Sequence, residues 1–153
     1  MGSAASLETD AQPEDGTRAA EFGVSAELLR QLLLQQNTQG WSTAEVCRDL
    51  IVSSTGKWSK TTGPLLRCSL PLFRPARAGG RCSFSALVRS RYPSHVQRAT
   101  HFISHAHSCD FGRLVASLCA LDAAQQADEG LHCFFWIDVF ALNQHDLASG
   151  YSK

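Results

Sequence analysis

Hydrophobic and polar residues in the N-terminal half of the chain follow the pattern of short amphipathic helices. Four leucines after Ser25 recur at helical spacing, and serine commonly caps helix starts, so the pattern predicts a helix over about 26–36. Ser42 and Glu45 have the spacing of a capping box and predict a second helix start. A third, shorter helix is predicted over 83–88, before a proline.

The C-terminal third has the pattern of a strand, a helix and a second strand. A β-prone run over 101–104 is followed by Asp110, a good helix cap, and by an apolar stripe that predicts a helix over about 110–126. The segment 131–140 is apolar nearly throughout, as expected of a strand covered on both faces, and we place its strand near 132–138. The two strands should be parallel neighbours, joined by a right-handed crossover. Trp136 or its aromatic neighbours should fill the core.

These patterns predict an α/β domain with a parallel sheet, preceded by short helices. The first 21 residues are small, polar and acidic, and cannot bury enough apolar surface to offset the entropy of ordering. Another segment concentrates proline, glycine and basic residues, which makes a regular element there unexpected. The predicted organisation is a disordered tail (1–21), N-terminal helices (22–56), a basic loop (57–81) and the α/β domain (82–153).

The composition is that of an ordinary globular protein. Of the 153 residues, 44% are hydrophobic and 18% are charged. The six cysteines lack CxxC spacing and no secretory leader is visible, so we interpret them as reduced thiols in a cytoplasmic protein. The first residues also fit the pattern for myristoylation of Gly2, although so short a pattern often arises by chance.

Charge is distributed unevenly along the chain, although the formal net charge is zero. Residues 1–49 carry a net charge of −5, residues 50–109 carry +9, and residues 110–153 carry −4. A basic middle segment can contact phosphate, but this one lacks the interleaved aromatic residues that stack on bases. We therefore expect a solvated basic loop rather than a nucleic-acid-binding surface.

Two polar strings follow the two predicted strands. Residues 104–110 (SHAHSCD) come after the first strand, and residues 138–146 (DVFALNQHD) come at the end of the second. Ligands bind at the carboxyl ends of strands in open parallel sheets, so we expect the two strings to be neighbours in space. The candidate ligand-binding residues are Ser104, His105, Asp138, Asn143, Gln144 and His145.

Each of these polar residues has a structural and a ligand-binding interpretation, and the sequence leaves both open. A carboxylate at Asp138 needs hydrogen-bond donors, which the turn's backbone or Asn143 would supply, so it either staples the turn or binds a ligand. His105 and His145 either face each other and bind an anionic or ribose group or are structural histidines. The helix that begins near Asp110 would add backbone N–H donors.

The two strings also resemble known families. FISHAH, followed by an amphipathic helix, resembles the first strand and helix of Toll/interleukin-1 receptor (TIR) domains. FFWIDVFALNQHD is similar to the motif of heterokaryon-incompatibility (HET) domains, a buried Trp-Ile-Asp strand followed by Asn-Gln and an acidic residue. STAEVCRDLIVSSTGK and CSFSALV are similar to the lead-in helices of algal and protist proteins with such a domain. The resemblance spans about residues 42–146, and His107 stands where relatives have Trp or a similarly large residue.

This resemblance implies a flavodoxin-like, TIR-like parallel sheet of which the chain holds only the first βαβ unit. Residues 82–153 would then be the N-terminal part of a TIR/HET-like domain with a role in intracellular signalling or protein interaction. It implies protein partners and self-association, which the unpaired edges of so small a sheet also favour. No cofactor is implied as a resident group, and NAD or a related nucleotide is the ligand to test.

An NAD-hydrolysing activity is the enzymatic role that the TIR resemblance implies for a longer chain. The catalytic glutamate of that family lies on a helix in the later half of the domain. No glutamate of this sequence has a matching position, since all of them lie ahead of the core of the second strand. We therefore carry over no catalytic residue.

A zinc-dependent hydrolase is the alternative from another class of protein. His105, His107 and Asp110 resemble part of the His-x-His-x-Asp-His motif of the metallo-β-lactamase fold, in which imidazoles near a strand end share a zinc ion. The fit is partial, because Cys109 stands where the motif has Asp and Asp110 where it has His.

Overall fold

The computed structural model describes residues 21–56 and 82–150. The predicted tail, apart from its last residue, and the predicted basic loop over 57–81 lie outside the described residues, so both stay predictions. The described cysteines are free thiols, as the sequence predicted: Cys47, Cys82, Cys109, Cys119 and Cys133.

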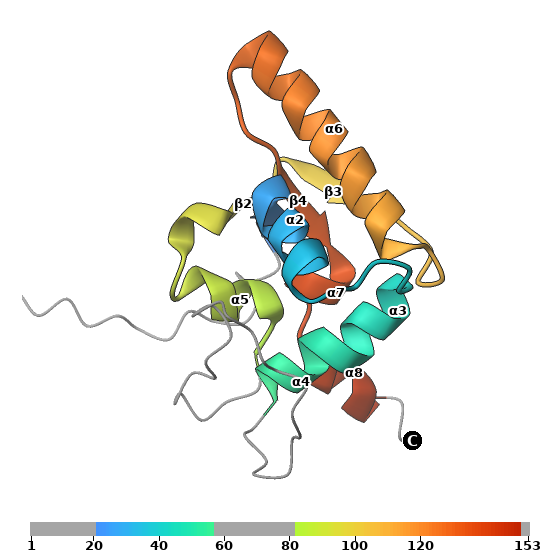
Figure 1. The fold of residues 1–153 in the computed structure, drawn as a ribbon. Coiled ribbons are helices and arrows are strands. Elements are labelled where there is room, and N and C mark those ends of the chain that lie inside the picture. Colours follow the sequence, from blue (N-terminus) through green and yellow to red (C-terminus); the bar gives the residue numbers. More distant parts are fainter. Residues whose placement is uncertain (1–20, 57–81, 151–153) are drawn as a thin grey trace, which may run out of the picture.

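The described residues form a four-stranded mixed sheet (Figure 1). Its strands are β1 (Phe22–Ser25), β2 (Val96–Arg98), β3 (His101–Ile103) and β4 (Phe134–Ile137), in the order β2-β1-β4-β3. β3 and β4 run parallel, with Phe102 opposite Trp136, which confirms the predicted parallel pair. β1 runs antiparallel to both β2 and β4.

The position of β1 corrects the predicted sheet. The α/β class holds, but a wholly parallel sheet does not, because β1 lies between β2 and β4 and runs antiparallel to both. The sequence predicts only helices over 22–56, yet this segment begins with a central strand. Four residues, Phe-Gly-Val-Ser, are too few to show an alternating pattern, and the strand exists because its neighbours on both sides pair with it.

The predicted helix starts of the N-terminal half are confirmed. Ser25 caps its helix by accepting a hydrogen bond from the Leu28 N–H at 3.2 Å. Ser42 and Glu45 form the predicted capping box, in which each side chain accepts from the other residue's backbone N–H. The helical segment that begins at Thr43 contains a π-helical stretch between two short α-helical ones. The elements are α2 (Ala26–Gln35), α3 (Thr43–Glu45), the π-helical η1 (Val46–Ile51) and α4 (Val52–Thr55).

Two helices of the C-terminal part also begin where the sequence predicts. Ser83 and Asp110 cap their helices through their side chains. The second strand is shorter than predicted, because it ends at Ile137 and a helical turn begins at Asp138. The elements are α5 (Phe84–Arg89), the 3-10 turn η3 (Pro93–His95), α6 (Phe111–Glu129), α7 (Asp138–Ala141) and α8 (Gln144–Gly150).

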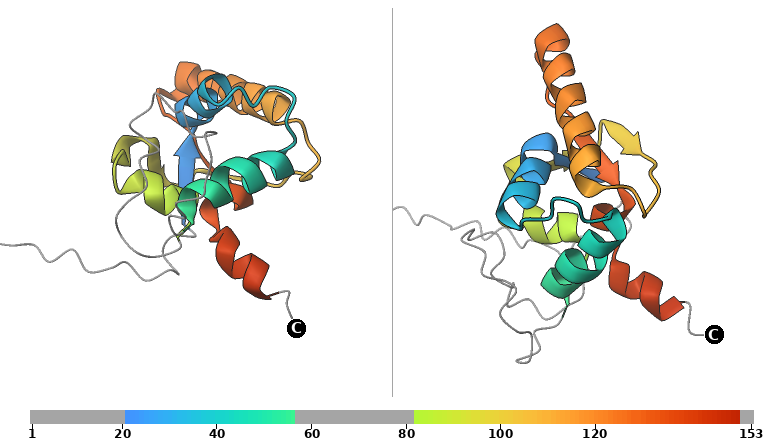
Figure 2. Two further views of the ribbon diagram at one scale, coloured as in Figure 1. Left: turned by 60° about the horizontal axis from the view of Figure 1, so that its bottom comes forward. Right: turned by 45° about the vertical axis from the view of Figure 1, so that its right-hand side comes forward.

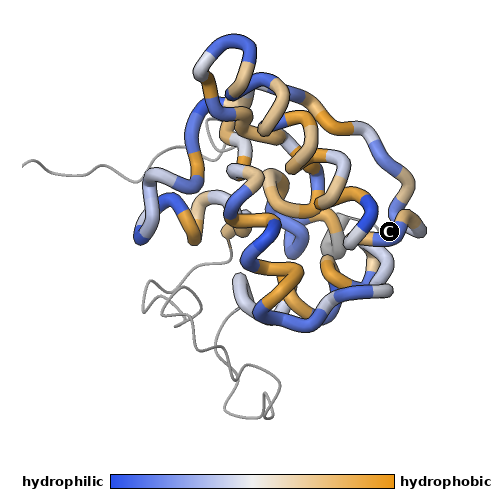
Figure 3. The backbone as a smooth tube through the Cα atoms, turned by 45° about the horizontal axis from the view of Figure 1, so that its top comes forward, coloured by the Kyte–Doolittle hydropathy of each residue, from blue (hydrophilic) through white to orange (hydrophobic). Residues whose placement is uncertain are grey.

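The helices gather around one hydrophobic core. α2 and α6 lie side by side, and α3 to α4, α5 and α7 lie below them in the orientation of Figure 1 (Figures 1 and 2). Hydropathy changes repeatedly along the helices in Figure 3, as expected of helices that bury one face. In this core, the ring centroid of Phe140 lies 5.5 Å from that of Phe84 and 6.3 Å from that of Phe111.

The aromatic residues of β4 divide between the two faces of the sheet. Phe135 and Ile137 are completely buried, whereas Trp136 is only half-buried. Trp136 stacks on Phe102 of β3, with ring centroids 4.6 Å apart, and Phe102 is 70% exposed. The sequence predicted that Trp136 or its aromatic neighbours fill the core, and Phe135 is the ring that is completely buried, because successive side chains of a strand point to opposite faces.

Candidate functional site

The two polar strings meet at the carboxyl ends of β3 and β4. His107 Nε2 lies 3.0 Å from Asp138 Oδ2, and His105 Nδ1 lies 4.0 Å from Asp138 Oδ1. The rings of His105 and His107 have centroids 5.7 Å apart. The predicted proximity of the two strings is confirmed, and its centre is one carboxylate between two imidazoles.

Asp138 obtains its donors from the backbone and from His107. Its Oδ1 accepts a hydrogen bond from the Val139 N–H at 2.7 Å, because Asp138 is the first residue of α7 and the N–H groups of a first helical turn lack intrahelical partners. Its side chain is 36% exposed, so a carboxylate here remains solvated on one side. Asn143, one of the donors that the sequence predicted, binds elsewhere.

The two histidines differ in burial. The His107 side chain is 59% exposed, whereas that of His105 is only 5% exposed. Nε2 of His105 has no hydrogen-bond partner among the described residues. A buried polar atom without a partner is uncommon and marks a place where a water or another polar group is expected.

Backbone hydrogen bonds fix the loop that carries the histidines. The first turn of α3 donates twice to it, from Thr43 N to Cys109 O and from Ala44 N to His107 O, both at 2.9 Å. Phe111 N donates to Trp41 O at 2.8 Å. The N–H groups at the start of α3, which have no partner within the helix, thus hold the loop in place.

The Asp138 carboxylate raises the pKa of a nearby thiol, that of Cys47 in η1. Burial raises the pKa of the Cys47 thiol, and the negative charge of Asp138 raises the pKa further. Both effects favour the protonated thiol. The nucleophilic form of cysteine is the thiolate, so Cys47 has the opposite of the environment that activates a catalytic cysteine.

The other candidate residues have different roles. Gln144 Nε2 donates to the Asp138 backbone carbonyl at 3.0 Å, so this residue supports the site. Asn143 bonds instead to Asp146 at the start of α8. His145 Nε2 lies 3.0 Å from Thr55 Oγ1 of α4, whereas His105 lies beside Asp138, and the contact with Thr55 favours the structural interpretation of His145. Ser104 is exposed.

The zinc alternative is not supported by the position of Asp110. Its Oδ1 accepts from Arg113 N at 2.8 Å and caps α6. Within residues 21–56 and 82–150, no three His, Cys, Asp or Glu side chains are placed to hold a metal ion. The same cap uses one of the N–H donors expected at the start of α6, and Phe111 N is already bonded to Trp41 O.

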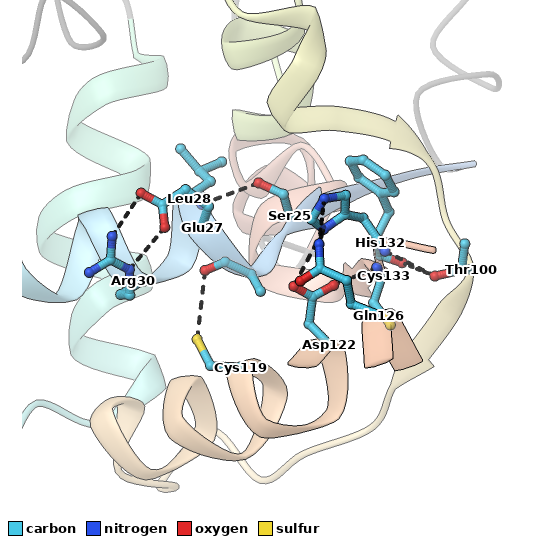
Figure 4. Close-up of polar contacts among 12 residues, drawn as sticks. Ser25, Glu27, Leu28, Arg30, Thr100, Cys119, Asp122, Gln126, His132 and Cys133 are labelled. Atoms are coloured by element: carbon cyan, nitrogen blue, oxygen red, sulfur yellow. Dashed lines mark hydrogen bonds and ion pairs between the residues drawn. The ribbon is translucent and has the colours of Figure 1, made fainter. Parts of the chain in front are cut away.

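A separate pocket of about 810 Å³ lies at the opposite end of β4, between α2 and the second half of α6. Figure 4 shows its polar contacts: Asp122 Oδ1 accepts from Cys133 N at 2.6 Å, and Gln126 Nε2 lies 3.0 Å from His132 Nε2. Arg30 and Gln31 both donate to Glu27, which lowers the pKa of Glu27.

The sequence did not indicate this pocket. Its polar residues come from β1, α2, η3, β2, α6 and the connection before β4, and no motif joins them. Its charged groups are paired with one another or with backbone, as Glu27 is with Arg30 and Asp122 with Cys133 N. The Asp122 contact joins α6 to the residue before β4, whereas the Glu27–Arg30 pair lies within α2, and we assign the pocket no ligand.

Comparison of the chain with protein-family models, with curated proteins and with solved structures gives no match. The fold and site therefore define the chain only as an α/β protein with a mixed sheet and a His-Asp cluster at the ends of its parallel strands. In the described part of the chain, no helix combines the length and the apolar character needed to cross a membrane.

Proposed function

We propose that this chain is an intracellular signalling and protein-interaction domain of the TIR-like or HET-like kind, and that it binds a ribose-bearing nucleotide beside His107 and Asp138. The observation that carries the proposal is the 3.0 Å contact between His107 Nε2 and Asp138 Oδ2, which joins the two strings that resemble those families. Carboxyl ends of neighbouring parallel strands are the usual ligand position in α/β sheets.

The chemistry of the cluster favours a sugar over a phosphate as the group that is contacted. The Asp138 carboxylate accepts hydrogen bonds only, and ribose hydroxyls donate them. The start of α6 has fewer free N–H donors for a phosphate than the sequence predicted, since Phe111 and Arg113 donate to Trp41 and Asp110. His107 is exposed and can reach a bound molecule, while the partnerless His105 Nε2 lies deeper.

Binding of NAD and of ADP-ribose, measured by isothermal titration calorimetry, tests the proposal. We expect Asp138→Asn to weaken binding about tenfold or more, because hydrogen bonds to a charged group contribute about 1.5–3 kcal/mol. His107→Gln should also weaken binding. His132→Gln is the matched control, because His132 is an exposed histidine at the other end of β4.

Two results would contradict this proposal. One is the absence of measurable binding of either nucleotide to the folded protein, and the other is equal affinity of Asp138→Asn and wild type. We expect no nicotinamide release from NAD, because no glutamate of this sequence has the position of the catalytic glutamate of TIR domains.

A further inference from the structure

The two edge strands of the described sheet differ in the side chains that they carry. β3 pairs only with β4 and β2 only with β1, so each leaves one side without a strand partner among the described residues. β2 exposes Gln97 and Arg98, and a charged residue on an edge discourages pairing. β3 carries no acidic, lysine or arginine side chain, and its central Phe102 is 70% exposed.

Phe102 is the most exposed of the large hydrophobic side chains in the described part of the chain. It is nevertheless held in place, because its ring stacks on Trp136 at 4.6 Å with an angle of 22° between the planes. Because Phe102 belongs to the edge strand β3 and Trp136 to β4, Phe102 is the outer ring of this stacked pair. The right-hand view of Figure 2 shows β3 at the margin of the body, with no described helix or strand beyond it.

We propose that β3 is a dimerisation edge, at which a second copy of this chain adds its own β3 in antiparallel orientation. A two-fold axis at Phe102 places Phe102 opposite its equivalent and His101 opposite Ile103 of the other copy. This arrangement brings no like charges together, because the strand has no permanently charged side chain. It pairs the backbone groups of β3 that have no strand partner among the described residues, and it brings the two Phe102 rings together.

A second copy is the partner that the edge itself fits. It offers an uncharged strand of the same three residues and the same stacked aromatic pair, so the contact is self-complementary. The strand is short, and the area that it buries is below that of a standard stable interface, so a weak, concentration-dependent dimer is expected. The inference depends on the sheet edge and not on the nucleotide site, so either can fail without the other.

Sedimentation velocity over a series of protein concentrations tests the dimer. We expect wild type to shift from monomer to dimer as concentration rises, and Phe102→Lys to raise the dissociation constant at least about tenfold, because two like charges then lie opposite each other. Leu34→Lys is the matched control, since Leu34 is a hydrophobic residue of α2 that is 56% exposed and lies away from the edge. It should dimerise like wild type.

Mixing Phe102→Lys with Phe102→Glu gives the decisive result. The two-fold axis places residue 102 of one copy opposite residue 102 of the other, so the mixture should form a heterodimer while each variant alone stays monomeric. Recovery in the mixture also shows that both variants are folded. A wild type that stays monomeric at the highest concentration, or dimerisation that Phe102→Lys leaves unchanged, would overturn the proposal.

Discussion

Replacing Phe135 by alanine is expected to lower the free energy of unfolding by about 3–5 kcal/mol, the usual cost of truncating a buried aromatic side chain. Phe135 is 0% exposed and belongs to β4, which pairs with β1 on one side and β3 on the other. Its ring also lies 5.8 Å from that of His101, between centroids. The cavity left by the ring would therefore open where three strands meet.

Urea denaturation followed by circular dichroism measures this loss, with the linear dependence on denaturant giving the free energy. Phe102→Ala is the matched control, because it removes the same ring from a neighbouring strand at a position that is 70% exposed. Its effect at low protein concentration should stay within about 1 kcal/mol, since a stacked aromatic pair contributes about that much. Similar losses for the two variants would show that Phe135 is not part of the core.

The sequence indicated the β4 strand but not which of its rings is buried. Residues 134–137 are all apolar, so the run carries no alternation from which an inner and an outer face can be read. The position of β4 between β1 and β3 decides which of its side chains are buried. Phe135 and Ile137 face the core, and Trp136 stacks on Phe102. A large aromatic residue in an apolar strand predicts burial of the strand rather than of that residue.

Helix starts were predictable because their signals are local. Ser25, Ser42, Ser83 and Asp110 each bond to a backbone N–H within the next three residues, so their spacing alone suffices. β1 and β2 have four and three residues and no such signal. Their pairing joins residues far apart in the chain, as Val24 with Val96, and this depends on the whole fold.

The sequence predicted which two segments form the candidate site, but not which of their side chains contact one another. The rule that carboxyl ends of parallel strands share an edge brought the two strings together. The early end of β4 was not foreseen. Because α7 begins at Asp138, it is the Val139 N–H and His107 that bond its carboxylate, while Asn143 and His145 turn to Asp146 and Thr55. The predicted backbone donor is thus present as the Val139 N–H, and His107 takes the place that was predicted for Asn143.

Replacing Gly23 by alanine should destabilise the protein by about 3 kcal/mol, at the upper end of the usual cost of overpacking. A Cβ at Gly23 would lie 2.7 Å from the Phe134 carbonyl carbon and 2.8 Å from the Phe135 backbone nitrogen. These are backbone atoms of β4, so no side-chain rotation relieves the contact. The methyl group would push β1 away from β4, and β2 is attached to the sheet only through β1.

Gly130→Ala is the control variant. It shows how much of the loss of stability in Gly23→Ala comes from the steric contact with β4 and how much from replacing a glycine at all. Gly130 has φ of 68° at the end of α6, and a Cβ there would meet nothing within 4 Å, so only backbone strain of about 1–2 kcal/mol is expected. Urea denaturation should rank Gly23→Ala as the more destabilised variant. Hydrogen exchange should show faster exchange at Val96–Arg98 in Gly23→Ala and unchanged exchange there in Gly130→Ala. If Gly23→Ala lost no more stability than Gly130→Ala, the close approach of β1 to β4 would be refuted.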